Sequence, residues 1–394
     1  MRRIALVGLV LLAALAAAEA AGANARGGFT VVGLTADGVF RVDPVTLKPV
    51  GRSVPIPFPW GADALSPDRR ILAVAANNAA FVRLIDVRSM RTIGDVRVAA
   101  NGLIWLSPRL LVVEVQNAAG TQLFAVDAGT RQVRWRASVD DPLGRLERFG
   151  GGLVAVTAPA GHVGQSRLIE VGATGQARAV VLDETLAGSS WPDDPSKAVG
   201  DVRTPGLVVD PSRGHAYVFG ADEPTADVDL ASLSVVYHGG NRTLAKAFGG
   251  WERNATWLGH GRVAVSGLDF RAAVAADGTE SQTIAPAGLT LVDTTTWTSR
   301  PVDPSVGDVV RSEGVLITTG STYSSNQGPA QGIGLSLLGL DGTPRAHLLG
   351  RALVLFTTVV HGLAYTWTGG RVVVTDPAAG KVLTNRPNRL IEIL

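Results

Sequence analysis

The chain has 394 residues, of which 46% are hydrophobic, and it carries a formal net charge of only +2 and no cysteine. So small a charge, without a stripe of basic residues, argues against a nucleic-acid-binding protein. The lack of cysteine excludes disulfides and a lipid-modified cysteine, so stability must come from the core. The 47 glycines and 21 prolines are typical of a chain with many short strands and tight turns.

The first residues have the pattern of an export signal. The basic start Met1–Arg3 is followed by the apolar run Ile4–Ala18 and then by small residues, with Ala18–Ala20 as one cleavage candidate. We predict a signal peptide over residues 1–25 and a mature domain over 26–394. The protein is then exported, and is extracellular or associated with the cell envelope. The alternative is an uncleaved membrane anchor, for which the apolar run is short. The bias towards Ala, Arg and Gly suggests a bacterial source.

The segment Gln122–Trp135 contains the clearest unit of structure in the chain. An apolar run, Leu123–Val126, is typical of a strand buried between packed sheets. Asp127 ends this run, and its carboxylate can accept backbone hydrogen bonds that close a tight turn. Gly129 tolerates the turn, and a second strand follows.

Acidic turns of this kind recur every 35–65 residues or so. The acidic residues that follow apolar runs are Asp43, Asp86, Asp127, Glu170, Asp229, Asp293, Asp341 and Asp376. A recurring unit of this length predicts an array or a closed ring. We therefore predict an all-β protein with a single β-propeller of about eight four-stranded blades, with seven as the alternative. The lone terminal strand Arg389–Leu394 is expected to complete the first blade and close the ring, because closure removes free sheet edges.

The segment Gly214–Val236, GHAYVFGADEPTADVDLASLSVV, resembles the YVTN-type and WD-type repeats of exported bacterial propellers. In those repeats an apolar strand is followed by a D-x-x-[TS] turn. The resemblance extends as a repeat pattern over most of the mature chain, and it implies the propeller fold without implying one function.

The segment Leu123–Trp135 also has a weaker similarity to the repeats of quinoprotein (PQQ-type) propellers. The positions that fit the A-x-D-x-x-T-G-x-x-x-W pattern are Ala125, Asp127, Thr130 and Trp135. Arg131 stands where that pattern has glycine. The catalytic and calcium-binding residues of the quinoprotein enzymes have no counterparts that can be placed on this chain.

Four long segments are predicted to be loops on a single face of the ring. They are Leu186–Val202, Gly240–Glu252, Asp269–Pro286 and Ser321–Gln331. Two connect successive blades and two connect the second and third strands of a blade, and both kinds of connection emerge on the same side. Because propellers bind partners through variable loops, we predict that this loop-rich face binds. Drift in loop length is the alternative explanation.

The loops of this face combine aromatic and charged residues, which can stack on sugars or anchor a peptide. The predicted partner-binding residues are Trp191, Asp193, Lys197, Arg242, Lys246, Trp251, Asp269, Arg271 and Tyr323. The alternative for Trp191 and Trp251 is that they pack over the rim and hold their loops in place.

The sequence offers no catalytic, cofactor-binding or metal-binding residues that we can assign, and we expect no cofactor. The six histidines form no local pair and no H-E-x-x-H motif, and His215, His260 and His361 are expected at turns with structural roles. A site composed of residues from several blades remains an alternative. Two acidic clusters could hold Ca²⁺, although exposed acidic turns are far commoner. They are Asp222, Glu223 and Asp227, and Asp193 with Asp194. No nucleophile elbow or nucleotide-binding motif is present.

We therefore predict an exported, non-catalytic and monomeric propeller that binds a protein, a peptide or an envelope glycan through its loop-rich face. The alternative is an exported enzyme similar to quinoprotein dehydrogenases or lyases, with a site at the mouth of the central channel. That enzyme would need polar residues from several blades to converge there. A purely structural element of an envelope assembly is the third possibility.

Overall fold

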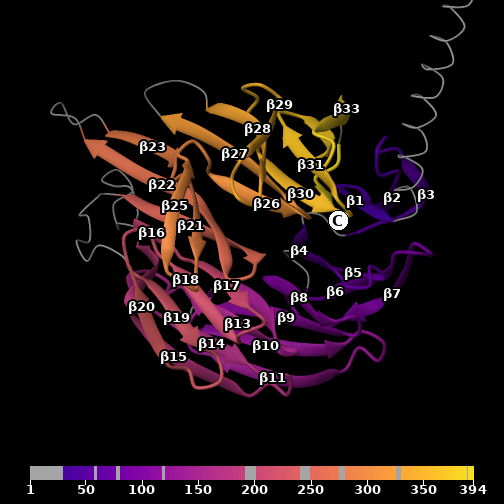
Figure 1. Cartoon of the computed structure of the whole chain (residues 1–394). Coiled ribbons are helices and arrows are strands. Elements are labelled where there is room, and N and C mark those ends of the chain that lie inside the picture. The colour runs from indigo at the N-terminus through magenta and orange to yellow at the C-terminus, as the bar shows by residue number, and fades with distance from the viewer. Residues whose placement is uncertain are drawn as a thin grey trace, which may run out of the picture.

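A computed structural model gives the fold. It describes residues 30–56, 60–76, 80–117, 120–190, 201–239, 249–274, 280–324, 330–387 and 389–394. The regular elements in these ranges are β-strands, arranged as mainly antiparallel sheets around a common centre (Figure 1). The all-β class and the single β-propeller are therefore confirmed. The described ranges contain no helix that is long and apolar enough to be a membrane span.

Five sheets are separate blades of four strands each. The first consists of β1 (Val31–Thr35), β2 (Gly38–Val42), β3 (Pro49–Val54) and β34 (Glu392–Ile393). The second consists of β4 (Trp60–Leu65), β5 (Ile71–Ala76), β6 (Val82–Asp86) and β7 (Arg91–Val96). The third consists of β8 (Gly102–Ser107), β9 (Leu110–Asn117), β10 (Gly120–Asp127) and β11 (Val133–Val139).

The other two separate blades come later in the chain. One consists of β17 (Gly206–Asp210), β18 (His215–Phe219), β19 (Thr225–Asp229) and β20 (Val235–His238). The other consists of β30 (Phe356–Val360), β31 (Leu363–Thr368), β32 (Arg371–Asp376) and β33 (Lys381–Pro387).

The remaining strands form one continuous sheet of 14 strands. Its first part contains β12 (Leu143–Phe149), β13 (Gly152–Thr157), β14 (Val163–Val171), β15 (Ala177–Ser190) and β16 (Asp201–Thr204). Its middle part contains β21 (Gly249–Gly259), β22 (Arg262–Val274), β23 (Glu280–Pro286), β24 (Leu289–Asp293) and β25 (Thr298–Asp303). Its last part contains β26 (Asp308–Ser312), β27 (Val315–Ser324), β28 (Gln331–Gly339) and β29 (Pro344–Leu348).

The predicted number of about eight four-stranded blades, or seven, is therefore wrong, since the structure shows five. The physical reason is the length of β15, β22 and β27, which have 14, 13 and 10 residues. Their ends run on past the ordinary blade length and pair with β16 and β23. β16 in turn pairs in parallel with β21, which joins strands that would otherwise belong to separate sheets. An acidic turn marks a hairpin, and a hairpin does not have to belong to a separate sheet.

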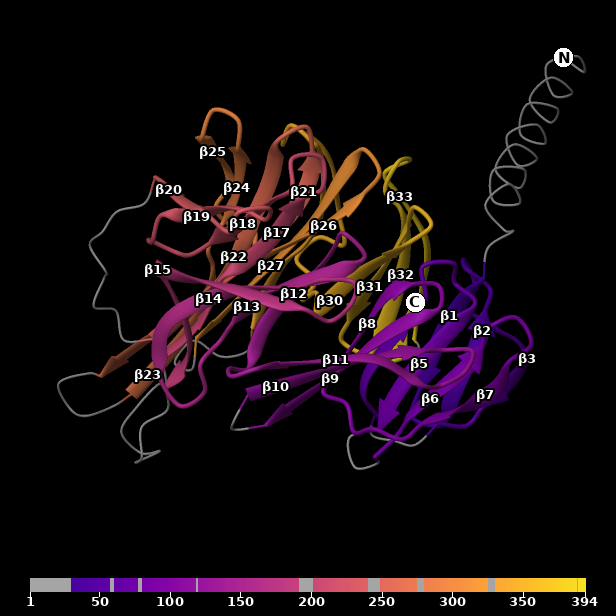
Figure 2. The ribbon, with the colours of Figure 1, turned by 90° about the horizontal axis from the view of Figure 1, so that it is seen from below.

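The same long strands replace much of the predicted loops. Trp251 and Glu252 lie in β21, Asp269 lies in β22, and Tyr323 lies in β27. The hairpin of β22 and β23 lies at the outside of the molecule in both Figure 1 and Figure 2.

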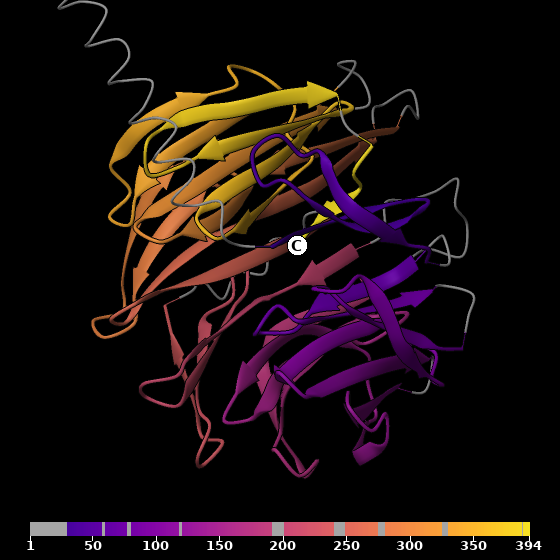
Figure 3. The same cartoon turned by 90° about the vertical axis from the view of Figure 1, so that its right-hand side faces the viewer.

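The C-terminal strand closes the ring, as the sequence predicted. Gly33 pairs with Ile393 and Leu34 pairs with Glu392, so that β34 is the fourth strand of the first blade (Figure 3). Leu390 and Ile393 are buried in the core between this blade and the β30–β33 blade. The indole of Trp367 donates a hydrogen bond to the Leu390 carbonyl at 2.9 Å, which joins the two blades by a buried polar contact.

Seven of the eight predicted acidic turns are capped by their acidic residue, whereas the carboxylate of Glu170 pairs with Arg178. The Asp127 carboxylate accepts hydrogen bonds from the amides of Gly129 and Thr130, at 3.0 and 2.8 Å. Arg131, four positions after Asp127, adopts the left-handed conformation with φ near 60°. The non-glycine residues in this conformation at the same offset in other turns are Leu47, Met90, Leu233 and Trp297. The turn therefore imposes the left-handed conformation at this position even where the residue is not glycine. A non-glycine residue adopts that conformation at a cost in free energy.

Candidate functional site

The predicted partner-binding residues divide into two groups. Trp191, Asp193, Lys197, Arg242 and Lys246 lie outside the described residues. Trp251, Asp269, Arg271 and Tyr323 lie on β21, β22 and β27, although the side chain of Arg271 is outside the described part. Among these residues Asp269 lines a pocket, whereas Tyr323 is exposed on β27 and is not part of the pocket lining.

This pocket has a volume of about 610 Å³ and lies between the β18–β19 connection and the face of β22 and β24. The connection supplies its acidic wall, with Asp222 and Glu223. Strand β22 supplies Val265, Ser266 and Asp269, so one predicted residue lines the pocket directly. Pockets of this size are typical of sites for small ligands or for single side chains of a partner.

Arg253 is the buried cation of the pocket, with a side chain only 12% exposed. It donates a hydrogen bond to Asp269 at 2.9 Å and two more to the carbonyls of Glu252 and Leu268. Its guanidinium carbon lies 5.8 Å from the centre of the Trp251 ring. Trp251 is buried, so its place in this site is to support Arg253 from behind.

Glu223 is the buried acid of the pocket. Its carboxylate accepts a hydrogen bond from the amide of Ala221 at 2.9 Å and lies 3.4 Å from Arg203, which also pairs with Asp201. Burial raises the pKa of Glu223, and the nearby backbone amides and Arg203 offset this only in part. The group therefore keeps a proton at higher pH than an ordinary glutamate.

Ser266 stands out because its hydroxyl is unpaired. The residue is only 1% exposed and lines the pocket, yet its Oγ has no hydrogen-bond partner among the residues that the structure describes. A buried hydroxyl without a partner costs stability. Ser266 pairs with Asn254 across β21 and β22, so its side chain lies on the face of β22 opposite to that of Arg253 and Asp269.

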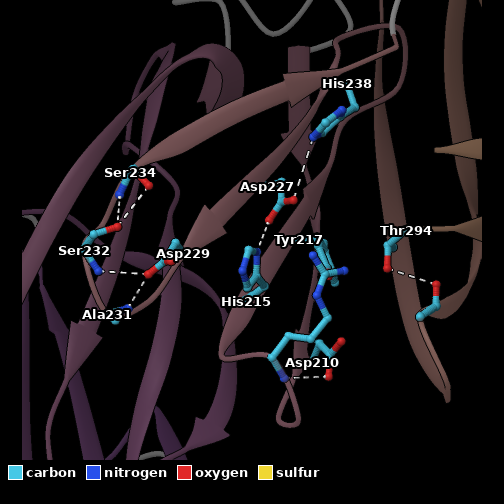
Figure 4. A network of polar contacts seen from close by, with 12 residues as sticks. Asp210, His215, Tyr217, Asp227, Asp229, Ala231, Ser232, Ser234, His238 and Thr294 are labelled. Carbon is cyan, nitrogen blue, oxygen red and sulfur yellow. Dashed lines mark hydrogen bonds and ion pairs between the residues drawn. The ribbon is translucent and has the colours of Figure 1, made fainter. Parts of the chain in front are cut away.

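A second polar network lies beside the pocket and is shown in Figure 4. Asp227 lies between two imidazoles, 2.6 Å from Nδ1 of His215 and 3.7 Å from Nε2 of His238. The ring of His238 stacks on Trp297 with the centroids 3.8 Å apart. Burial lowers the pKa of His238, although the charge of Asp227 opposes this. The structural role predicted for His215 fits this packed arrangement between two sheets.

A third polar cluster lies on the other side of β21. Arg145 of β12 donates hydrogen bonds to Glu252 and Asn254 of β21, both at 2.6 Å. Asp308 of β26 lies near Glu252 and Arg145, and burial raises its pKa. Because side chains alternate along a strand, β21 presents Arg253 to the pocket and Glu252 to this cluster. Polar residues from three strands of the continuous sheet thus converge in this cluster.

The sequence analysis missed several of these residues. Arg145, Arg203, Arg253 and Ser266 were not singled out, because each lies within a strand and belongs to no recognisable motif. Glu223 was considered only as a calcium ligand. Within the described ranges no group of three or more carboxylate or imidazole side chains is arranged to hold a metal ion.

The comparisons with known proteins show a fold and no family. No family model matches the chain, and neither does any curated protein sequence. Among solved structures, the dihydro-heme d1 dehydrogenase NirN in complex with DHE is 13% identical, with a TM-score of 0.62, and the match covers 94% of this chain and 75% of NirN. A eukaryotic initiation factor is 10% identical, with a TM-score of 0.50, covering 92% and 97% of the two chains. BamB from Moraxella catarrhalis is 10% identical, with a TM-score of 0.48, covering 86% and 92%. At 13% identity the similarity to NirN supports the propeller fold alone, and proteins of different function are built on that fold.

Proposed function

We propose that this protein is an exported, monomeric and non-catalytic propeller that binds a protein, a peptide or an envelope glycan on its loop-rich face. The observation that carries the proposal is the pocket beside β22, which combines a largely buried arginine, Arg253, with a buried acid, Glu223. The predicted residue Asp269 lines it, and the predicted residue Trp251 supports its arginine.

The mechanism is rigid display. Arg253 is held by three hydrogen bonds and by the Trp251 ring, so it loses little freedom when a partner arrives. Preorganisation of this kind reduces the entropy cost of binding. The long strands β22 and β23 extend the wall beyond the pocket and offer further surface to a partner.

The test is to block the pocket. Thr290 lines it, and Thr290→Trp would fill part of its volume. Ser138→Trp, at an exposed position on the outer strand β11, adds the same bulk away from the site and is the matched control. We expect Thr290→Trp to abolish quantitative capture of partners from an envelope extract, while Ser138→Trp retains it and both variants melt near the wild type. Equal capture by both variants would contradict the proposal.

The enzyme alternative is supported by the cluster of Arg145, Glu252, Asn254 and Asp308. Its test is a thermal-shift panel with PQQ and Ca²⁺, to which a dihydro-heme is added because NirN, a dihydro-heme d1 dehydrogenase, shares the propeller fold. A ligand that binds only the folded state raises the melting temperature. A shift that is lost in Arg145→Met but kept in Thr290→Trp would favour the enzyme over the binding scaffold.

A further inference from the structure

A second cleft lies at the seam where the ring closes, between the first blade and the β30–β33 blade (Figure 1). Its volume is about 750 Å³, and Phe40 and Leu390 belong to the apolar part of its lining. The lining reaches both ends of β2, with Gly38 at one end and Lys48 beyond the other. Because a strand of this length spans about 17 Å, the cleft can hold a short extended segment of chain.

The charges around this cleft are mainly positive. Lys48, Arg386 and Arg389 are exposed residues of its lining, and Asp37 is the acidic one. The side chains of Arg386 and Arg389 make no hydrogen bond or ion pair to any residue that the structure describes. A guanidinium has a planar fork of donors that matches a carboxylate in geometry. The cleft therefore attracts an acidic ligand.

Large apolar side chains are exposed next to these arginines. Ile391, which is 43% exposed, directly follows the buried Leu390. The carbonyl of Leu390 accepts the hydrogen bond from Trp367, on which the ring of Phe356 stacks with the centroids 4.2 Å apart. Phe356 is itself 39% exposed, and its neighbour Leu355 is 60% exposed. Exposed apolar groups that gather in this way mark an interaction surface.

The apolar group and the two arginines lie on the loop-rich face. In the β30–β33 blade Phe356 pairs with Trp367, and Arg371 pairs with Pro387. These four residues therefore lie at the end of the blade where the second strand, β31, turns into the third, β32. Connections of this kind emerge on the loop-rich face.

We propose that this seam binds an acidic peptide segment of a partner protein, in which carboxylates flank large apolar side chains. The carboxylates would pair with Arg386 and Arg389, and the apolar side chains would pack beside Ile391 and Phe356. A neutral glycan would leave both guanidinium groups without a charged partner. The inference goes beyond the proposed function, because the seam is built from other strands than the pocket beside β22, and either site can exist without the other.

The probes are three peptides with capped ends. Ac-Gly-Asp-Leu-Phe-Asp-Gly-NH₂ carries two carboxylates around an apolar pair. One control has asparagine in place of both aspartates, which keeps the shape and removes the charge. The other has serine in place of the leucine and the phenylalanine. Binding of each to the mature protein is measured by ligand-observed NMR titration, and we expect the first peptide to bind about tenfold more tightly than either control.

Two substitutions with matched controls locate the site. Arg389→Gln should weaken binding of the acidic peptide about tenfold, whereas Arg97→Gln, at an exposed position between β7 and β8, should leave it unchanged. Ile391→Ser should weaken it severalfold, whereas Val236→Ser, at an exposed position on β20, should not. All four side chains are exposed, so the melting temperatures should stay near that of the wild type, and a loss of affinity then reports the surface itself.

Three outcomes would overturn the inference. The first is equal binding of the acidic peptide and its asparagine control, or full binding to Arg389→Gln. The second is binding of phosphatidylglycerol vesicles, but not of the peptide, that is lost in Arg389→Gln, because the seam would then face a lipid surface. The third is a dimer in light scattering that Ile391→Ser abolishes, because a second copy of the chain would then cover the seam.

The variant Thr290→Trp separates this inference from the proposed function. It fills the pocket beside β22, so it should bind the acidic peptide as the wild type does. If its capture from an extract is unchanged while the peptide still binds, the proposed function falls and the seam stands. If capture is lost and no variant or wild type binds the peptide, the seam falls and the proposed function stands.

Discussion

The blade of β8–β11 and the continuous 14-stranded sheet are made from the same kind of hairpin, but they differ in strand length. In the blade the strands have six to eight residues, and β10 ends directly in the acidic turn at Asp127. In the continuous sheet β15 reaches 14 residues and β22 reaches 13. A strand that extends beyond the other strands of its blade leaves backbone hydrogen-bonding groups unpaired at its end. Here the extended end of β15 pairs with β16, and that of β22 pairs with β23.

The two regions also differ in the kind of side chain that they bury. The blade of β8–β11 packs against its neighbours through aliphatic residues such as Leu123 and Val112. The continuous sheet carries Arg145, Arg253 and Asp269, which form part of the pocket and of the neighbouring cluster. The continuous sheet thus holds one side of the pocket, and the separate blade of β17–β20 supplies the acidic side with Asp222 and Glu223.

The largest effect is expected in the regular blade. Leu123 is fully buried, and Leu123→Ala should lower the free energy of unfolding by about 3 kcal/mol through lost burial and the cavity it leaves. Leu268→Ala in β22 should lower the free energy of unfolding distinctly less, because Leu268 is half-buried and solvent already reaches it. Urea denaturation monitored by tryptophan fluorescence measures both. Equal losses would mean that the continuous sheet is as tightly packed as the blade.

The junction that creates the continuous sheet can be broken at Gly250. A Cβ at this position would lie 2.1 Å from the carbonyl oxygen of Val202, so Gly250→Ala should push β16 away from β21 at a cost of about 2 kcal/mol. Gly314, where an added Cβ would meet no atom within 4 Å, is the control site for the same substitution. Hydrogen exchange should become faster over 201–204 and stay unchanged over β8–β11. Unchanged exchange at 201–204 would show that the parallel pairing does not depend on this glycine.

The separate blades could be predicted from the sequence, whereas the continuous 14-stranded sheet could not, and the reason is physical. Acidic turns, apolar runs and the lone terminal strand are local signals, and they predicted the propeller and the pairing of β34 with β1. The merging of sheets depends on how far a strand continues past its turn, which no local signal near Ser190 or Val274 marks. The pocket depends on residues far apart in the chain: Glu223 and Arg253 meet only because β18–β19 packs beside β21 and β22.

Both regions bury carboxyl groups. The pH dependence of stability that results should be clearest for the carboxyl pair at the ring closure. Asp63 of β4 hydrogen-bonds to Glu392 of β34, and burial together with the charge of Glu392 raises the pKa of Asp63 to about 8. The protonated form is favoured in the folded state, so its stabilising effect is complete below the unfolded pKa of about 4 and is lost as pH rises towards 8. The slope should reach about 1.4 kcal/mol per pH unit at most. Asp63→Asn should flatten the urea-denaturation stability between pH 4 and 8, and an unchanged slope would place the titration elsewhere.

The smallest effect is expected at a single acidic turn. Hydrogen bonds from Thr130, with the Arg134 guanidinium at 2.9 Å, hold the pKa of Asp127 down at about 2. Its stabilising effect is therefore present above the ordinary pKa near 3.8 and is lost as pH falls towards 2, the opposite direction to Asp63. Asp127→Ala should cost about 1 kcal/mol at neutral pH, as for other side chains that cap backbone amides.

A comparison with Asp341 makes this last substitution informative. Asp341 caps a turn between β28 and β29 of the continuous sheet, with its carboxylate accepting from the Thr343 amide at 3.1 Å. If the turns are interchangeable units, Asp341→Ala and Asp127→Ala should lower stability by similar amounts, since each removes the same kind of backbone cap. If Asp341→Ala lowers the free energy of unfolding much less than Asp127→Ala does, neighbouring strands hold the Asp341 turn in place. The acidic cap then contributes little to stability in the continuous sheet.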